Sequence, residues 1–111
     1  MRVVVVWWDL SESRETVASL REFLRGEAVD RWAQVPGLRL KLWISDTEGP
    51  AERWGAVFVW ESAAAAEQPL PTKAGELIGY PPAHRSSFDL EATTEGLYDL
   101  ARLAGRGLAF A

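Results

Sequence analysis

The chain contains no cysteine and a single histidine, and it has no long apolar run. The missing cysteines exclude disulfides, thiolate nucleophiles and iron–sulfur centres, and with one histidine they also exclude zinc clusters. We therefore expect no metal and no cofactor. The longest uninterrupted apolar run, Val3 to Trp8, is far shorter than the roughly 20 residues that cross a bilayer. It begins at the third residue and ends at Asp9, which is unlike a signal peptide, so we expect a cytoplasmic protein without a membrane partner.

The chain also lacks a basic stripe. Its 12 Lys and Arg residues are scattered, and 16 Asp and Glu residues give a net charge of −4. Phosphate neutralisation needs clustered cations, so we expect no nucleic-acid partner. A length of 111 residues with 48% hydrophobic residues predicts one domain that folds around its own core. The six tryptophans are the unusual feature of this composition.

The first third of the chain predicts a strand followed by a long helix. The β-branched and aromatic run Arg2–Asp9 is apolar without interruption, which favours a central strand. Apolar residues then recur at helical spacing from Val17 to Trp32, with Ser11 or Ser13 as the expected cap. We expect this helix to bend at Gly26 and to stop before Pro36.

The remaining elements follow from alternation, turn residues and caps. We expect strands at 38–45 and 53–61 joined by a hairpin loop at 46–52, an alanine-rich helix after Ser62, a helix at 73–78 after Thr72, an edge strand at 84–92 and a tail helix at 94–105. The order β-α-β-β-α-β predicts an α+β ferredoxin-like fold with a four-stranded antiparallel sheet. The whole chain, 1–111, forms one domain, with a core at 1–92 and a helical tail at 93–111. Two helices cover only one face of such a sheet, so we expect a homodimer in which a second copy covers the other face.

The segments 36–38, 41–43 and 55–62 (PGL, KLW and GAVFVWES) carry a resemblance. They are similar to the dimeric α+β-barrel superfamily, in particular to antibiotic biosynthesis monooxygenases and to small bacterial proteins assigned as monooxygenases, over roughly residues 1–92. The resemblance implies a homodimeric barrel with a ligand pocket between each sheet and its helices. Members include cofactor-independent oxygenases of aromatic polyketides, heme-degrading enzymes, dehydratases and cyclases, so the fold leaves the chemistry open.

Two positions can be compared with the polyketide oxygenases, and one of them matches. Their pocket tryptophan at the end of the third strand corresponds to Trp60, whereas Ala56 stands where they have an asparagine. The heme-degrading branch needs an asparagine on the first strand and an early histidine. The chain has no asparagine, and its histidine is His84, so heme degradation is not expected.

Alternation along the third strand puts Phe58 on the same face as Trp60. These rings predict an aromatic wall that stacks on a planar ligand, with ordinary core packing as the alternative. Trp43 extends this wall or lies at a dimer seam. We expect Trp7 and Trp8 to lie on opposite faces of the sheet. Trp32 should pack in the core from the first helix, and Trp54 should lie at the rim of the pocket beside the hairpin loop.

Tyr80, His84 and Arg85 form a compact cluster of proton-active and anion-binding groups. A neutral imidazole can take a proton from an acidic phenol or enol, and a guanidinium or phenol can stabilise the oxyanion. His84 and Arg85 alternate faces, and we expect His84 to face the pocket because Ser86 and Phe88 share its face. A solvated edge strand is the alternative. For Lys41 we expect a structural role, with contact to a substrate or to a carboxylate of the partner as the alternative.

These residues predict a protein that binds a small apolar, aromatic or polyketide-like molecule. The expected activity is a cofactor-independent monooxygenase of antibiotic biosynthesis, with His84 as catalytic residue and Trp60, Phe58, Trp43, Tyr80 and Arg85 binding the substrate. Two alternatives stay open: a non-oxidative polyketide cyclase or isomerase that uses His84 as acid and base, and a ligand-binding dimer without catalysis.

Overall fold

The computed structural model describes residues 1–97 and 107–110. Its four strands are β1 (Arg2–Asp9), β2 (Leu38–Asp46), β3 (Arg53–Trp60) and β4 (His84–Asp89). They form one sheet in the order β2-β3-β1-β4, and every neighbouring pair is antiparallel. The ferredoxin-like α+β fold is therefore confirmed, with β1 central and β4 at an edge. The last strand ends at Asp89, three residues before its predicted end.

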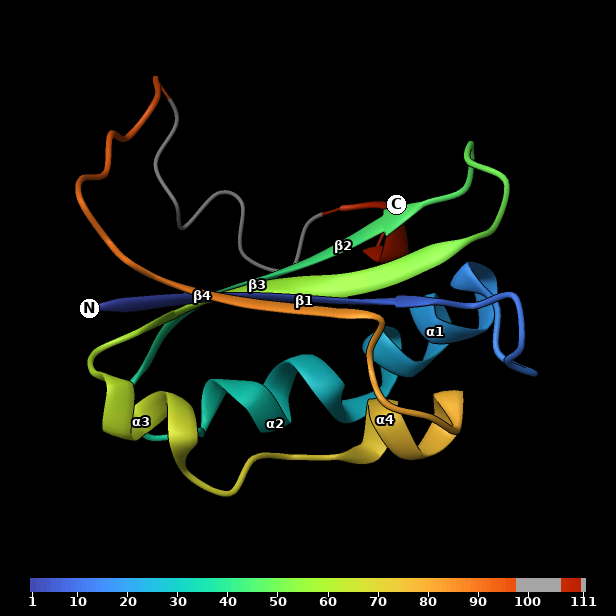
Figure 1. Cartoon of the computed structure of the whole chain (residues 1–111), viewed down its shortest axis with the longest axis horizontal. Coiled ribbons are helices and arrows are strands. Elements are labelled where there is room, and N and C mark those ends of the chain that lie inside the picture. The colour runs from blue at the N-terminus through green and yellow to red at the C-terminus, as the bar shows by residue number, and fades with distance from the viewer. Residues whose placement is uncertain (98–106, 111) are drawn as a thin grey trace.

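The α-helices lie on one side of the sheet (Figure 1). They are α1 (Val17–Phe23), α2 (Val29–Ala33), α3 (Ala63–Glu67) and α4 (Lys73–Ile78), and a π-helical turn, Leu24–Ala28, joins α1 to α2. The predicted bend is confirmed, because Gly26 has the non-helical ψ of −111° inside that turn. Ser62 caps α3 as expected, through its side-chain oxygen and the Ala65 N–H.

The predicted cap of the first helix is wrong. Thr16 caps the helix: its side chain accepts from the Ser19 N–H, while the Ser19 hydroxyl accepts from the Thr16 N–H. This reciprocal pair satisfies two backbone donors at once. Ser13 instead donates its hydroxyl to the Ile78 carbonyl, which ties the start of the helix to α4.

The helix-facing side of the sheet holds the core. Along β3, Ala56, Phe58 and Trp60 are buried on this side, opposite Val6, Val4 and Arg2 of β1. The next residue toward the hairpin is packed even more closely. A Cβ atom on Gly55 would lie 2.2 Å from the Val6 carbonyl oxygen, so β1 and β3 approach each other at a point that only glycine allows.

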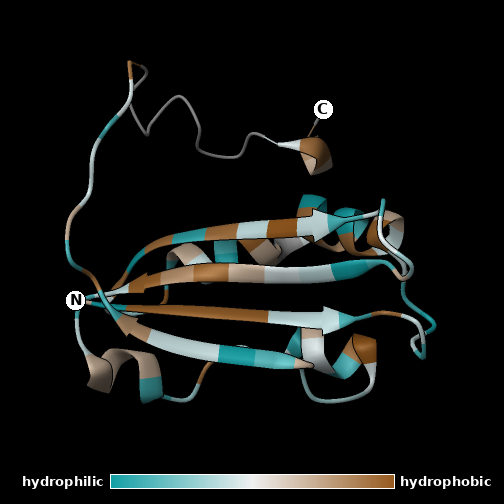
Figure 2. Ribbon diagram, turned by 45° about the horizontal axis from the view of Figure 1, so that its top comes forward, coloured by the Kyte–Doolittle hydropathy of each residue, from teal (hydrophilic) through white to brown (hydrophobic). Residues whose placement is uncertain are grey.

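The opposite side of the sheet, which we call the open face, carries none of the described α-helices (Figure 2). Large apolar side chains are exposed on it from both edge strands. Leu42 and Ile44 of β2 are 47% and 42% exposed, and Phe88 of β4 is 54% exposed. In this view apolar colour alternates with polar colour along β2 and fills the first half of β1, whereas β4 is mostly polar. The open face is thus the part of the described surface where a partner would bury apolar area.

The C-terminal tail differs from its prediction where it is described. Residues 94–97 form no helix, and the rest of the predicted helix, 98–105, lies outside the described residues. Leu108–Phe110 form a short 3-10 helix against α1 and the π-helical turn. Ala109 is buried there, and its carbonyl accepts a hydrogen bond of 2.9 Å from Arg25 Nη1. The final apolar residues therefore do have a partner, which the sequence pattern did not indicate.

Among the described residues, no helix has the length and apolar character needed to cross a membrane. The cytoplasmic location stays a prediction.

Candidate functional site

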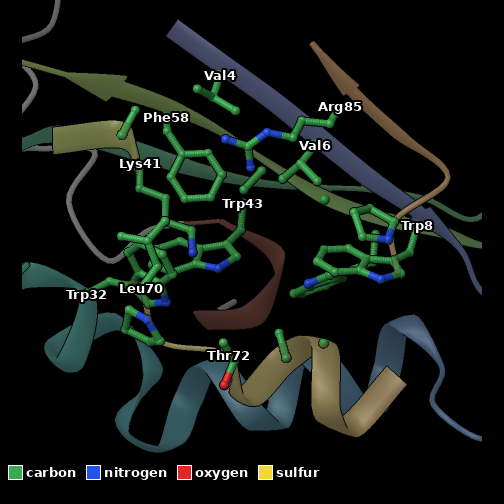
Figure 3. A pocket seen from close by; sticks show the side chains of 18 of the residues that line it. Val4, Val6, Trp8, Trp32, Lys41, Trp43, Phe58, Leu70, Thr72 and Arg85 are labelled. Carbon is green, nitrogen blue, oxygen red and sulfur yellow. The ribbon is translucent and has the colours of Figure 1, made fainter. Parts of the chain in front are cut away.

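A cavity of about 260 Å³ lies between the sheet and the helices (Figure 3). Its wall includes five of the six tryptophans of the chain, namely Trp8, Trp32, Trp43, Trp54 and Trp60. Smaller apolar residues of the strands, α3 and α4 complete the wall. The described lining residues include two cationic side chains, Lys41 and Arg85, and no carboxylate. The volume lies just below the range of roughly 300–1,000 Å³ that is usual for small-molecule sites, which suits a compact bicyclic or tricyclic ligand.

The sheet register brings the rings of the wall together. Lys41 pairs with Phe58, and Trp43 pairs with Ala56, so these side chains of β2 and β3 share the helix-facing side. Phe58 stacks on Trp60 with ring centroids 5.9 Å apart and planes only 8° apart. Trp32 of α2 packs on Phe58 at 5.4 Å with its ring tilted by 55°. The result is a rigid aromatic surface that can orient a planar molecule.

Lys41 is the chemically distinctive residue of the cavity. Its Nζ atom lies 3.3 Å from the ring centroid of Trp32, 4.4 Å from that of Trp43 and 4.7 Å from that of Phe58. Within the described residues it makes no ion pair or hydrogen bond. Burial lowers the pKa of Lys41 from 10.5 to about 6 because the ammonium loses its hydration. The ring faces attract the charged form, which acts against this shift. At neutral pH most of the amine is therefore uncharged, and it can accept a proton.

Arg85 lines the cavity from the other edge of the sheet. It lies on β4, opposite Val6 of β1, and its guanidinium reaches toward Phe58 (Figure 3). The placement of Arg85 along the pocket agrees with its predicted role as a binding residue. An arginine stays charged at every working pH, so this edge of the cavity carries a permanent positive charge.

The expectation that His84 faces the pocket is wrong. His84 pairs with Trp7 of β1, and its imidazole stacks on the Trp7 indole with centroids 5.6 Å apart and planes 18° apart. Its Nε2 atom lies 2.7 Å from the Ser86 hydroxyl. These groups lie on the open face, because Arg85 takes the inward position and neighbours on a strand alternate. Ser86 and Phe88 do share a face with His84, as expected, but that face is turned away from the helices.

Tyr80 does not line the main cavity either. Its hydroxyl donates to the Asp9 carbonyl, and its own carbonyl accepts a 2.8 Å hydrogen bond from Trp8 Nε1. It lies beside a more open depression next to α4. Tyr80 thus fastens the loop after α4 to β1, and its hydroxyl is already engaged. Trp54, expected at the rim, is only 4% exposed and belongs to the core.

The cavity therefore brings together Trp60, Phe58, Trp43 and Arg85 of the predicted set and leaves out His84 and Tyr80. Lys41, expected to be structural, is the site residue that the sequence reasoning missed. A signal for it was present, because Lys41 stands two residues before Trp43 and must share its face. The described residues contain no group of His, Asp and Glu side chains that could hold a metal ion.

One comparison with known proteins, the search of solved structures, supports the fold. No protein-family model and no curated protein sequence matches the chain. A solved structure described as a "putative antibiotic biosynthesis monooxygenase" from Deinococcus radiodurans is similar, with a TM-score of 0.54 and 17% sequence identity. The similarity covers 88% of this chain and all of that chain. At this identity the likeness establishes the ferredoxin-like architecture, and the chemistry has to be argued from the cavity.

Proposed function

We propose that this protein removes a proton from a planar aromatic or polyketide-like molecule and thereby starts a cofactor-independent monooxygenation. Lys41 is the base, Arg85 stabilises the oxyanion, and the aromatic wall holds the ring system. The observation that carries the proposal is the Lys41 amine, which lies over three aromatic rings, without a described ion-pair partner, in a cavity that also contains Arg85. Lys41 takes the role that the sequence assigned to His84.

The chemistry requires a substrate with a methylene group between an aromatic ring and a carbonyl-conjugated ring. The neutral amine of Lys41 accepts a proton from this methylene, and the negative charge moves onto the carbonyl oxygen, where Arg85 stabilises it. The carbanion gives one electron to dioxygen, and the resulting radical combines with superoxide to form a peroxide. Loss of water then leaves a ketone. In sum, one CH₂ group and one O₂ molecule give one C=O group and one water molecule, and the substrate supplies all the electrons.

The largely apolar lining of the cavity supports this reaction. The described lining is mainly aromatic and aliphatic, so it replaces water around the reacting carbon and strengthens the interaction of the oxyanion with Arg85. The description of the Deinococcus structure favours oxygenation over other outcomes of the same proton removal. A cyclase or isomerase would use the same base and the same oxyanion partner, so it is the second candidate function.

Oxygen uptake with dithranol, a dihydroxyanthrone with such a methylene, tests the proposal. We expect the wild-type protein to consume dioxygen and form the quinone faster than buffer alone. Lys41→Met should reduce the rate to that of buffer, whereas Lys73→Met, which removes the other lysine of the chain, should not. Equal rates for wild type and Lys41→Met would reject Lys41 as the base. Conversion of a polyketide-like substrate without dioxygen would reject the oxygenase and favour the cyclase or isomerase.

A binding protein without catalysis is distinguished through the aromatic wall. Trp60, 1% exposed, supports Phe58 from behind. Trp60→Phe should weaken the binding of an aromatic ligand in both cases. A binding protein without catalysis would show no turnover above buffer, either as wild type or as Lys41→Met.

We also propose that a second copy of the chain covers the open face. The exposed side chains of Leu42, Ile44 and Phe88 on this face are the apolar area that a homodimer would bury. Light scattering should give about twice 12.3 kDa. Leu42→Glu should shift the protein toward the monomer, whereas Ala63→Glu, which adds the same charge at the exposed start of α3, should not. A wild-type protein that scatters as a monomer would reject this arrangement.

A further inference from the structure

The described lining of the main cavity carries basic side chains without acidic ones, so a ligand with a negative charge would complement it. Lys41 enters from the edge strand β2, and Arg85 enters from the opposite edge strand β4. The described lining residues provide no carboxylate that could pair with either one. An anion that enters the cavity is favoured because it can form a charge-assisted hydrogen-bond pair with the guanidinium of Arg85.

Arg85 differs in this respect from other arginines of the sheet. Arg2 pairs with Asp89 at 2.7 Å, and Arg39 pairs with Glu61 at 3.0 Å. Within the described residues, Arg85 has neither an ion pair nor a hydrogen bond. Its guanidinium instead points toward Phe58 at the cavity wall (Figure 3). It is therefore available to an incoming ligand.

At neutral pH Arg85 also carries the greater part of the positive charge of the cavity. The Lys41 amine, desolvated among its three rings, is largely uncharged there. A guanidinium offers two parallel N–H donors, whose spacing matches the two oxygens of a carboxylate. A phosphate dianion would call for further cationic donors beside it, which the described lining does not offer at this edge.

We infer that the ligand of this cavity is an aromatic carboxylate, whose carboxylate group pairs with Arg85 while its ring system lies against Phe58 and Trp43. This inference rests on the proposed function and names its substrate class. The carboxylate end anchors at β4, and the ring extends across the central strands toward β2. The carbon that reacts is then on the side of Lys41. The carboxylate pair uses two of the five guanidinium N–H donors, so Arg85 determines specificity and can still donate to the oxyanion.

Calorimetric titration with two matched probes tests the inference. Naphthoate and naphthamide have the same ring system and similar shape, but only naphthoate carries a charge. At about pH 8, where Lys41 is uncharged and Arg85 is not, we expect naphthoate to bind at least about tenfold more tightly, as a charge-assisted hydrogen-bond pair requires.

Variants assign this preference to one side chain. Arg85→Gln should abolish the preference by weakening naphthoate binding and leaving naphthamide binding unchanged. Arg85→Lys keeps the charge and should restore part of the preference. Arg39→Gln removes a surface arginine that already pairs with Glu61, so it should leave both affinities as they are. Because Arg85 is exposed on an edge strand, Arg85→Gln should unfold at the same temperature as wild type.

Three results would overturn the inference: equal affinities for the two probes, a preference that persists in Arg85→Gln, or no binding of either probe. The oxygen-uptake experiment is independent of all three. A protein that prefers naphthoate through Arg85 but consumes no dioxygen would keep the inference and lose the oxygenase. A protein that oxidises dithranol but binds both naphthalene probes equally would keep the oxygenase and lose the carboxylate anchor.

Discussion

Replacing Lys41 by methionine should stabilise the protein at neutral pH. Methionine has similar length, fills the same space among the rings and needs no hydration. In the wild type, the amine has a pKa of about 6 instead of 10.5, so the folded protein at neutral pH keeps it uncharged while the unfolded chain protonates it. Deprotonating the amine costs about 1.4 kcal/mol for each pH unit below its unfolded pKa of 10.5. At pH 7 the buried amine therefore lowers the free energy of unfolding by at most about 5 kcal/mol.

The net gain is smaller than this bound. Lys41 is only partly buried, so screening by solvent reduces this bound. We expect Lys41→Met to raise the free energy of unfolding by about 1–3 kcal/mol near pH 7. Each kcal/mol should raise the melting temperature by roughly 4–8 °C. The same variant should have lost its turnover.

The pH dependence of this gain is the sharper test. Between about pH 6 and 10.5 the unfolded wild-type chain binds one more proton than the folded protein, so wild-type stability rises with pH in this window. The variant lacks the amine, so the difference in free energy of unfolding between variant and wild type should narrow by up to about 1.4 kcal/mol per pH unit as pH rises.

Urea unfolding, followed by tryptophan fluorescence at equal protein concentration over this window, measures this difference. Lys73→Met, which changes an exposed lysine, should show no narrowing. A gap that stays constant with pH, or a variant less stable than wild type at pH 7, would show that Lys41 is charged in the folded protein and would refute the reasoning.

Three further predictions follow from the placement of single residues. If the Lys41 amine is the base, kcat/KM should rise with pH through about 6 as the amine loses its proton and then level off, and an unchanged rate at lower pH would exclude it. His84→Ala should leave turnover and ligand affinity in the cavity unchanged, since His84 stacks on Trp7 on the open face; steady-state kinetics that show a large loss of turnover would return His84 to the mechanism. Gly55→Ala should cost more than about 3 kcal/mol in urea unfolding, because its Cβ would lie 2.2 Å from a backbone oxygen of β1, whereas Gly96→Ala, with open space around it, should be nearly neutral.

Much of the fold could be predicted because the local signals agree with one another. The apolar run at β1, the bend at Gly26 and the cap at Ser62 each depend on neighbours in the sequence, and each is found where it was expected. The helix after Thr72 also has its predicted bounds, Lys73–Ile78. The first helix cap was missed because Ser13, a good cap by residue type, makes a hydrogen bond to Ile78, far away in the sequence. Such a long-range partner leaves no local pattern.

The candidate site could be predicted only in part. Alternation along β3 placed Phe58 and Trp60 on one face, and that much needs no tertiary structure. The pairing of the strands then decided which residues of the edge strands β2 and β4 lie on the same face as Phe58 and Trp60. On β4, His84 and Arg85 alternate, and the sequence pattern is equally consistent with either one facing inward.

By itself, then, the sequence determined the order of the elements, the α+β class and the grouping of residues that share a strand face, since all of these follow from periodicity and caps. Only the tertiary structure decided which face of each edge strand lies under the helices. The register of β1 with β4 turned Arg85 inward and His84 outward, and the register of β2 with β3 turned Lys41 inward. Burial then lowers the pKa of the Lys41 amine, and that change depends on three rings contributed by α2, β2 and β3. A period of two shows which side chains belong together, whereas the packing of helices against one side of the sheet determines what surrounds them.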